Sequence, residues 1–182
     1  MSNTNPTMTK KQIFRNRAKV LAEKSAGEAA GRPGLDVVEI KLAQEKYAVE
    51  LVHVREVLPL KDVTPLPCTP AYVLGLINVR GQILSVIDLR VFFELPQESA
   101  TTATKVVVLH SSEMEVGVVA DAVVETRFVP LDEIRPALPT MTGIRETYLR
   151  GIAGGDLVIL DAARLLADKS ILVNEQVEGE SR

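Results

Sequence analysis

The sequence has one cysteine, no tryptophan and few aromatic residues, which make up 4% of its 182 residues. A single cysteine allows no internal disulfide and no thiolate metal cluster. No apolar run approaches the roughly 18 residues that a membrane-spanning helix needs. The first residues, Met-Ser-Asn-Thr-Asn-Pro-Thr, contain no apolar signal-peptide core. We therefore expect a cytoplasmic protein without membrane insertion.

Aliphatic residues have to supply the core. Hydrophobic residues make up 46% of the chain, enough for one large domain or two small domains that are closely joined. Since aromatic side chains are scarce, Val, Leu, Ile and Ala must fill the interior. Val and Ile have stiff side chains that suit a pleated sheet. The composition predicts a mostly-β fold.

The net charge of −3 hides an uneven distribution. Residues 1–34 carry seven basic and two acidic residues, a net charge of +5, whereas residues 35–182 carry 14 basic and 22 acidic residues, a net charge of −8. A basic arm could lie on its own acidic body, on an acidic partner or on a membrane surface. The acidic body argues against nucleic acid as the main ligand.

The arm contains one predicted amphipathic helix. Thr9 and Gln12 have the spacing of a capping box. The apolar residues behind them recur at three- and four-residue intervals: Ile13, Phe14, Ala18, Leu21 and Ala22. An Ala/Gly-rich stretch, 25–34, follows. This helix either packs on the body or frays, or it is a second docking element for a partner.

From residue 37 onward the hydrophobic period changes from helical spacing to alternation. We predict strands at 37–42, 47–51, 52–58, 76–79, 82–87, 105–110, 115–120, 122–129, 148–153 and 156–160. We predict short helices or helical turns at 69–75, 88–92, 131–134 and 162–167, and loops at 59–68 and 94–103.

A weak internal repeat supports two small barrels. Gly75-Leu-Ile, a hairpin and Asp88-Leu-Arg in one half match Gly151-Ile-Ala, a hairpin and Asp161-Ala-Ala in the other. Each half offers about five short strands. Because five strands expose two sheet edges, curling into a barrel is the usual way to remove them. The repeat predicts two barrels in series.

No residue set predicts catalysis, a metal site or a cofactor. His53 and His110 have no carboxylate or second ligand at a recognisable spacing, and Cys68 has no histidine partner. The glycine-rich stretch 151–156 has strand pattern on both sides, which favours a β-turn over a phosphate loop. An enzymatic or small-ligand-binding barrel stays as the alternative. A buried polar pocket around either histidine would favour it.

Arg80 is the most prominent exposed polar group. It lies at the predicted tip of the hairpin formed by 76–79 and 82–87. Five donors suit the guanidinium to carboxylates and carbonyls, and arginine is enriched at the centres of protein interfaces. The alternative is an internal salt bridge between Arg80 and an acidic residue of the barrel.

The hairpin segment Gly75-Leu-Ile-Asn-Val-Arg-Gly-Gln-Ile-Leu-Ser-Val-Ile-Asp-Leu-Arg90 resembles the signature of the CheW family, the coupling proteins of bacterial chemotaxis. Further matches follow in the family's order across residues 36–170: Tyr47-Ala-Val-Glu, Val54-Arg-Glu-Val57, Thr69-Pro-Ala-Tyr-Val-Leu-Gly75, Val116-Gly-Val-Val-Ala-Asp121, Glu133-Ile-Arg-Pro136, Tyr148-Leu-Arg-Gly-Ile and Leu157-Val-Ile-Leu-Asp161.

The resemblance implies two interleaved five-stranded SH3-like β-barrels with short cap helices in residues 35–170. We expect them to divide roughly near residue 100, with the chain crossing between them. They would be flanked by the arm, 1–34, and a tail, 171–182. It also implies a non-catalytic adaptor that joins the cytoplasmic tip of a methyl-accepting chemoreceptor to the regulatory domain of a CheA-type histidine kinase.

The resemblance also assigns residues to each partner. The receptor-facing residues would be Arg80, Asn78, Val79, Gly75, Glu56, Val54 and Val106. The kinase-facing residue would be Arg135, with Met141 in place of an aromatic residue that is frequent in the family. The long basic arm departs from the family and suggests an extra contact.

Overall fold

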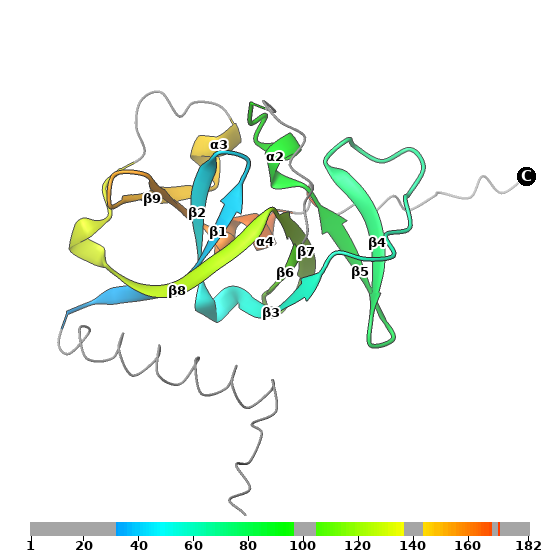
Figure 1. Cartoon of the computed structure of the whole chain (residues 1–182), viewed down its shortest axis with the longest axis horizontal. Coiled ribbons are helices and arrows are strands. Elements are labelled where there is room, and N and C mark those ends of the chain that lie inside the picture. The colour runs from blue at the N-terminus through cyan, green and yellow to red at the C-terminus, as the bar shows by residue number, and fades with distance from the viewer. Residues whose placement is uncertain (1–31, 97–104, 137–143, 169–170, 172–182) are drawn as a thin grey trace, which may run out of the picture.

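The computed structural model describes residues 32–96, 105–136, 144–168 and 171, and its strands form two five-stranded sheets (Figure 1). We call the sheet with the order β8-β1-β2-β10-β9 barrel A, and the sheet with the order β3-β6-β7-β5-β4 barrel B. Barrel A comprises β1 (Gly34–Leu42), β2 (Glu45–Glu50), β8 (Ala122–Pro130), β9 (Leu149–Ala153) and β10 (Leu157–Leu160). Barrel B comprises β3 (Val54–Pro59), β4 (Val73–Val79), β5 (Gln82–Ile87), β6 (Lys105–His110) and β7 (Glu115–Ala120).

Short helices connect or cap these strands. They are η1 (Leu51–His53), α2 (Leu89–Phe92), η2 (Leu131–Glu133), α3 (Ile144–Thr147) and α4 (Ala162–Ala167). The mostly-β fold of two interleaved barrels with short cap helices is confirmed. The predicted N-terminal helix lies outside the described residues, as does the tail after residue 171. Ile171 itself is buried in the core, so it does not belong to that tail.

The barrels do not follow each other along the chain, and residue 100 does not separate them. The chain builds β1 and β2 of barrel A, then all of barrel B, and returns to barrel A at β8. The repeat itself is real, since β4, β5 and α2 occupy the same topological positions as β9, β10 and α4. Alternation reveals that a segment is a strand, but it does not tell which sheet the strand joins.

Each barrel closes at a glycine. In barrel B, Thr64 and Leu76 exchange two backbone hydrogen bonds of 2.8 Å, and in barrel A, Arg135 and Ile152 exchange bonds of 2.9 and 2.8 Å. Gly75 precedes Leu76, and a Cβ at this position would lie 2.1 Å from the Thr64 carbonyl oxygen. The matching distance for Gly151, from the Arg135 carbonyl oxygen, is 2.3 Å. A larger residue at either glycine would push the closing segment away.

The helix starts predicted from capping residues are correct where the same residues do not belong to a strand. Asp88 accepts a hydrogen bond of 2.9 Å from the Arg90 amide at the start of α2, and Asp161 accepts one of 3.0 Å from the Arg164 amide in α4. The predicted helix at 69–75 is wrong, because β4 begins at Val73 and pairs with β5. Residues 51–53 form η1 and not the start of a strand. Pairing in the sheet outweighs the local helix signal at 69–75.

Three apolar clusters hold the fold. One contains only barrel A residues and one only barrel B residues, so each fills the inside of its own barrel. The largest combines β1 and β2 with β5, β6 and β7 and with both cap helices. Its stacked aromatic pair, Tyr47 of barrel A and Phe93 after α2, has ring centroids 6.1 Å apart. This shared cluster joins the barrels into one body.

A buried charge cluster lies where the chain returns from barrel B to barrel A. Arg90 donates to both Asp88 carboxylate oxygens and, through Nη1, to Asp121 Oδ1 at 2.6 Å. Asp121 Oδ2 accepts from the amide of Ala43 in the turn between β1 and β2. The hydrogen bonds that Arg90 donates to the Asp88 carboxylate raise the pKa of Arg90, so the guanidinium stays charged. The cluster therefore connects α2 to barrel A.

Candidate partner-binding surfaces

The β4–β5 hairpin carries Arg80 at its tip. Arg80 and Gly81 have φ values of 52° and 89°, as a two-residue type I′ turn requires, and the Gly81 amide donates to Asn78 Oδ1 at 2.7 Å. The Arg80 side chain is 79% exposed. The sequence prediction of an exposed guanidinium at this turn therefore agrees with the structure.

Glu56 on β3 orients that guanidinium. Arg80 Nη1 and Nη2 donate to the two Glu56 carboxylate oxygens at 3.3 and 2.9 Å, and the Glu56 side chain is only 21% exposed. A bidentate pair fixes the plane of the guanidinium. The alternative prediction, a salt bridge between Arg80 and an acidic residue of the barrel, is therefore also met, but this salt bridge lies on the surface and not in the interior. The outer edge of Arg80 stays open to solvent.

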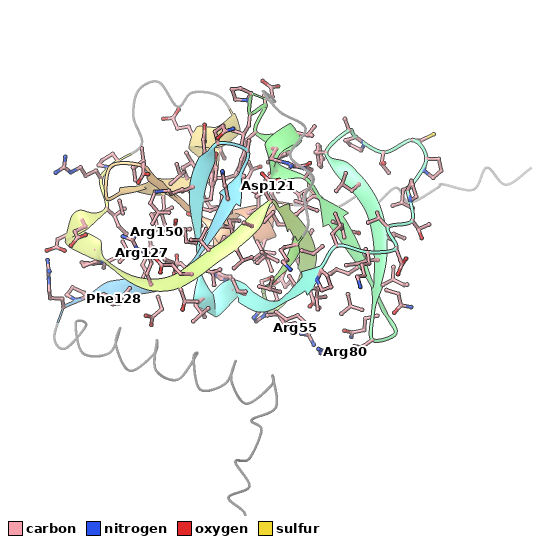
Figure 2. The ribbon with its side chains drawn as sticks, viewed as in Figure 1. Arg55, Arg80, Asp121, Arg127, Phe128 and Arg150 are labelled. Atoms are coloured by element: carbon pink, nitrogen blue, oxygen red, sulfur yellow. The ribbon has the colours of Figure 1, made fainter. Side chains whose placement is uncertain are left out.

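A second bidentate pair lies next to the first. Arg55 donates to both carboxylate oxygens of Glu115 on β7 at 2.8 and 2.7 Å. Figure 2 shows Arg55 and Arg80 close together at the lower edge of barrel B. Both arginines and both glutamates line a hollow of about 200 Å³. This edge therefore presents two guanidinium groups that are already oriented.

The other side of the hairpin is an open groove of about 550 Å³. Ile83 of β5 lies at its rim and is 64% exposed. The lining combines apolar and charged side chains: Leu58, Pro59, Lys61, Asp62, Thr64, Leu76, Ile77, Asn78, Val79, Arg80 and Ile83. An apolar floor with charges at the rim suits a protein surface such as an amphipathic helix.

The structure divides the seven predicted receptor-facing residues into three groups. Arg80, Asn78 and Val79 line the groove, and Glu56 orients Arg80. Val54 is half-buried at the start of β3. Val106, at 0% exposed, and Gly75 are buried inside barrel B. These last two cannot touch a partner directly; they shape the barrel that presents the others.

Arg135 lies on barrel A, in a groove of about 550 Å³. Its backbone closes the barrel and its side chain is exposed. The groove is lined by Asp132, Glu133, Arg135, Pro136, Ile152, Gly154 and Gly155. Met141, the second predicted kinase-facing residue, lies outside the described residues. The closing bridge beside this groove, Arg135–Ile152, corresponds to Thr64–Leu76 in barrel B, so the two grooves occupy equivalent places.

The charged turn beside the barrel A groove is also paired. Lys46 Nζ donates to Asp156 Oδ2 at 2.8 Å, which raises the pKa of Lys46 and lowers the pKa of Asp156. Both side chains are exposed, and both groups stay charged near neutral pH. The charged residues that line the barrel A groove are Asp132, Glu133 and Arg135, and those that line the barrel B groove are Lys61, Asp62 and Arg80.

Sequence reasoning missed several of these surface residues. Ile83 stands in a dense apolar run and reads as a core residue, and Lys61 stands in a proline-rich loop without a motif. The Arg55–Glu115 pair joins β3 to β7, 60 positions apart, so no local pattern could reveal it. The histidines are half-buried, with His53 Nδ1 3.4 Å from the His110 carbonyl oxygen. No cluster of three metal-ligating side chains occurs among the described residues.

A family comparison identifies this arrangement. The family model of the CheW-like domain matches residues 36–170. The chain belongs to the CheW-like family. Its relatives include the chemotaxis protein CheW of Klebsiella aerogenes, which is 31% identical over 157 residues, 85% of this chain and 93% of the relative. The protein FrzA of Myxococcus xanthus is 31% identical over 116 residues, 64% of this chain and 72% of the relative.

A solved structure of the family has the same fold. The scaffolding protein TtCheW from Thermoanaerobacter tengcongensis superposes with a TM-score of 0.62 at 28% identity, covering 70% of this chain and 89% of that protein. The described part of the chain contains no helix that is long and apolar enough to cross a membrane.

Proposed function

We propose that this CheW-like protein is a non-catalytic adaptor that holds a methyl-accepting chemoreceptor and a CheA-type histidine kinase in one cytoplasmic assembly. The receptor tip binds barrel B at the Arg80 hairpin and its groove, and the regulatory domain of the kinase binds barrel A around Arg135. The names of the relatives, chemotaxis and scaffolding proteins, support this function.

The observation that carries the receptor assignment is the exposed Arg80 side chain with its plane fixed by Glu56. Ordering a free arginine at an interface costs roughly 0.5–1.5 kcal/mol. Because Glu56 already restricts the guanidinium, this cost falls before the partner arrives. The open donors then suit carboxylates or helix C-terminal carbonyls on the receptor.

The mechanism is linkage between two bound partners. The receptor and kinase surfaces lie on different barrels of one rigid body, which the shared core and the Arg90 cluster hold together. A receptor that changes conformation therefore moves or releases the kinase through the adaptor. That bias can act only through a difference in affinity between the two receptor states.

A pull-down from extract of the source cells tests this function. Tagged wild-type protein should recover a chemoreceptor and a histidine kinase together, whereas Arg80→Glu should lose the receptor at least tenfold. Lys105→Glu, an equal charge reversal at an exposed position on β6, serves as the control and should recover both. Equal recovery of the receptor by Arg80→Glu would contradict the assignment of the hairpin.

A further inference from the structure

The hollow that the two arginine–glutamate pairs line is the open mouth of barrel B. Its lining includes Leu84 and Val108, which belong to the apolar cluster inside this barrel. The side chains of Arg55 and Arg80 are 50% and 79% exposed, whereas those of their glutamate partners are 30% and 21% exposed. The two carboxylates therefore lie deeper in the mouth than the guanidinium groups that they hold.

An irregularity in β3 turns Arg55 into this hollow. Val54 pairs with Leu109 and Glu56 pairs with Val108, the neighbouring residue of β6, so Arg55 is an extra residue in β3. Adjacent residues of a regular strand point to opposite faces of the sheet. A β-bulge changes the direction of a side chain, and here both Arg55 and Glu56 line the hollow. The bulge therefore brings both ion pairs to one surface.

Arg55 keeps hydrogen-bond donors for a partner. Both of its hydrogen bonds to Glu115 come from Nη1. Its Nε and Nη2 atoms make no hydrogen bond within the part of the chain that the structure describes. Glu115 thus restricts the position of the guanidinium and leaves two of its three nitrogens available.

The hollow adjoins the groove that we assign to the receptor, because Val79, Arg80 and Ile83 line both. A segment that lies in the groove and contacts Arg80 is therefore within reach of Arg55. The hollow of about 200 Å³ equals a cube with edges of roughly 6 Å, whereas a helix with its side chains is about 10 Å wide. The hollow can admit the ends of side chains but not the backbone of a partner helix.

We propose that Arg55 is a second receptor-binding residue, and that the segment bound there is an acidic helix with one carboxylate for Arg55 and another for Arg80. This inference rests on the proposed function, since it names the chemistry of the receptor at the same surface. Residues three or four positions apart on one helix face have Cβ atoms about 5–6 Å apart, which matches the width of the hollow. Because the adaptor's own glutamates lie deeper, the receptor carboxylates meet the guanidinium groups first.

Isothermal titration with a soluble cytoplasmic fragment of a methyl-accepting chemoreceptor from the source cells tests the role of Arg55. Arg55→Gln should weaken binding at least fivefold, and by a larger factor at low salt, because ions screen exposed charges. The matched control is Arg32→Gln, which removes an equal charge from the exposed Arg32–Asp132 pair beside barrel A and should leave the affinity unchanged. Equal affinities of the two variants would overturn the proposal.

Glu115→Gln separates receptor binding from a purely structural role of the pair. If Arg55 only stabilised barrel B, Arg55→Gln and Glu115→Gln would break the same ion pair and weaken binding equally. If Arg55 binds the receptor, Glu115→Gln keeps the guanidinium and should change the dissociation constant less than threefold. Equal losses of affinity would therefore overturn the proposal. Urea unfolding of both variants verifies that each is folded.

Replacing each Glu or Asp of the receptor tip by its amide tests the acidic helix. One replacement should weaken binding to the wild-type adaptor but not to Arg55→Gln. A second replacement, three or four positions away, should weaken binding to the wild type but not to Arg80→Gln. The absence of a carboxylate that couples to Arg55, or a different spacing between the two carboxylates, would overturn the acidic helix.

The same titrations distinguish failure of this inference from failure of the proposed function. A wild-type adaptor that does not bind the receptor fragment would overturn both. Binding that Arg80→Gln weakens and Arg55→Gln does not would overturn the inference alone.

Discussion

At the scale of single residues, we expect the pair between Arg80 and Glu56 to matter for receptor binding and hardly for stability. Exposed ion pairs contribute about 0–1 kcal/mol, and Arg80 is largely solvated. An interface arginine that loses its side chain typically costs about 2 kcal/mol or more, roughly a thirtyfold loss of affinity. Variants at Arg80 and at Glu56 should therefore differ in receptor affinity, although the two residues form one ion pair.

We predict that Glu56→Gln weakens receptor binding by about three- to tenfold, since the guanidinium loses its charged partner but keeps its exposed donors. Arg80→Ala should weaken binding at least thirtyfold. Both variants should unfold within about 0.5 kcal/mol of the wild type in urea. Isothermal titration with a receptor fragment checks the order, and a larger loss for Glu56→Gln than for Arg80→Ala would contradict a positioning role.

At the scale of elements, barrel closure depends on the two glycines that precede the bridging residues. Gly75→Ala places a Cβ 2.1 Å from the Thr64 carbonyl oxygen, with a φ of +139°. We expect a loss of at least about 3 kcal/mol of unfolding free energy from strain and broken pairing.

Gly81→Ala is the matched control, because its φ is also positive, at +89°, but no atom lies within 4 Å of the added Cβ. Backbone strain alone should cost about 1 kcal/mol there. Chemical denaturation of both variants gives the comparison. Equal losses would mean that backbone conformation, and not the close approach of Thr64, requires glycine at position 75.

The elements also show how far sequence reasoning reaches. The hairpin around Arg80–Gly81 and the caps at Asp88 and Asp161 were predictable, because each depends on residues a few positions apart. The assignment of strands to barrels was not, since β1 pairs with β8 across more than 80 positions. The family resemblance supplied the interleaving that periodicity left open.

The candidate site was predictable to a similar extent. Arg80 was recognisable as an exposed tip, and its pairing with Glu56 confirms that both lie on one surface. Val106, which the family resemblance placed on the receptor-facing surface, is 0% exposed, so it can only support that surface from inside barrel B. The Arg55–Glu115 pair depends on the order of β3, β6 and β7, which no local pattern contains.

At the scale of the whole molecule, the Arg90 cluster fixes α2 against barrel A. Arg90→Leu would leave the Asp88 and Asp121 carboxylates buried without their cation, and removing one member of a buried pair typically costs about 3–5 kcal/mol. Arg55→Leu, which breaks an exposed pair, should cost less than about 1 kcal/mol. Thermal unfolding checks both values. Similar losses of unfolding free energy in the two variants would show that the buried cluster stabilises the fold no more than an exposed ion pair.

The central claim is that two separate surfaces of one rigid body bind two different partners. Co-sedimentation of the kinase with receptor-bearing vesicles, with added adaptor, tests it most directly. Wild-type protein should bring the kinase down. The Arg80→Glu adaptor should stay in the supernatant, bound to the kinase. The Arg135→Glu adaptor should sediment with the receptor vesicles and leave the kinase in the supernatant. Loss of both partners by either variant, or of neither, would contradict the assignment of one partner to each barrel.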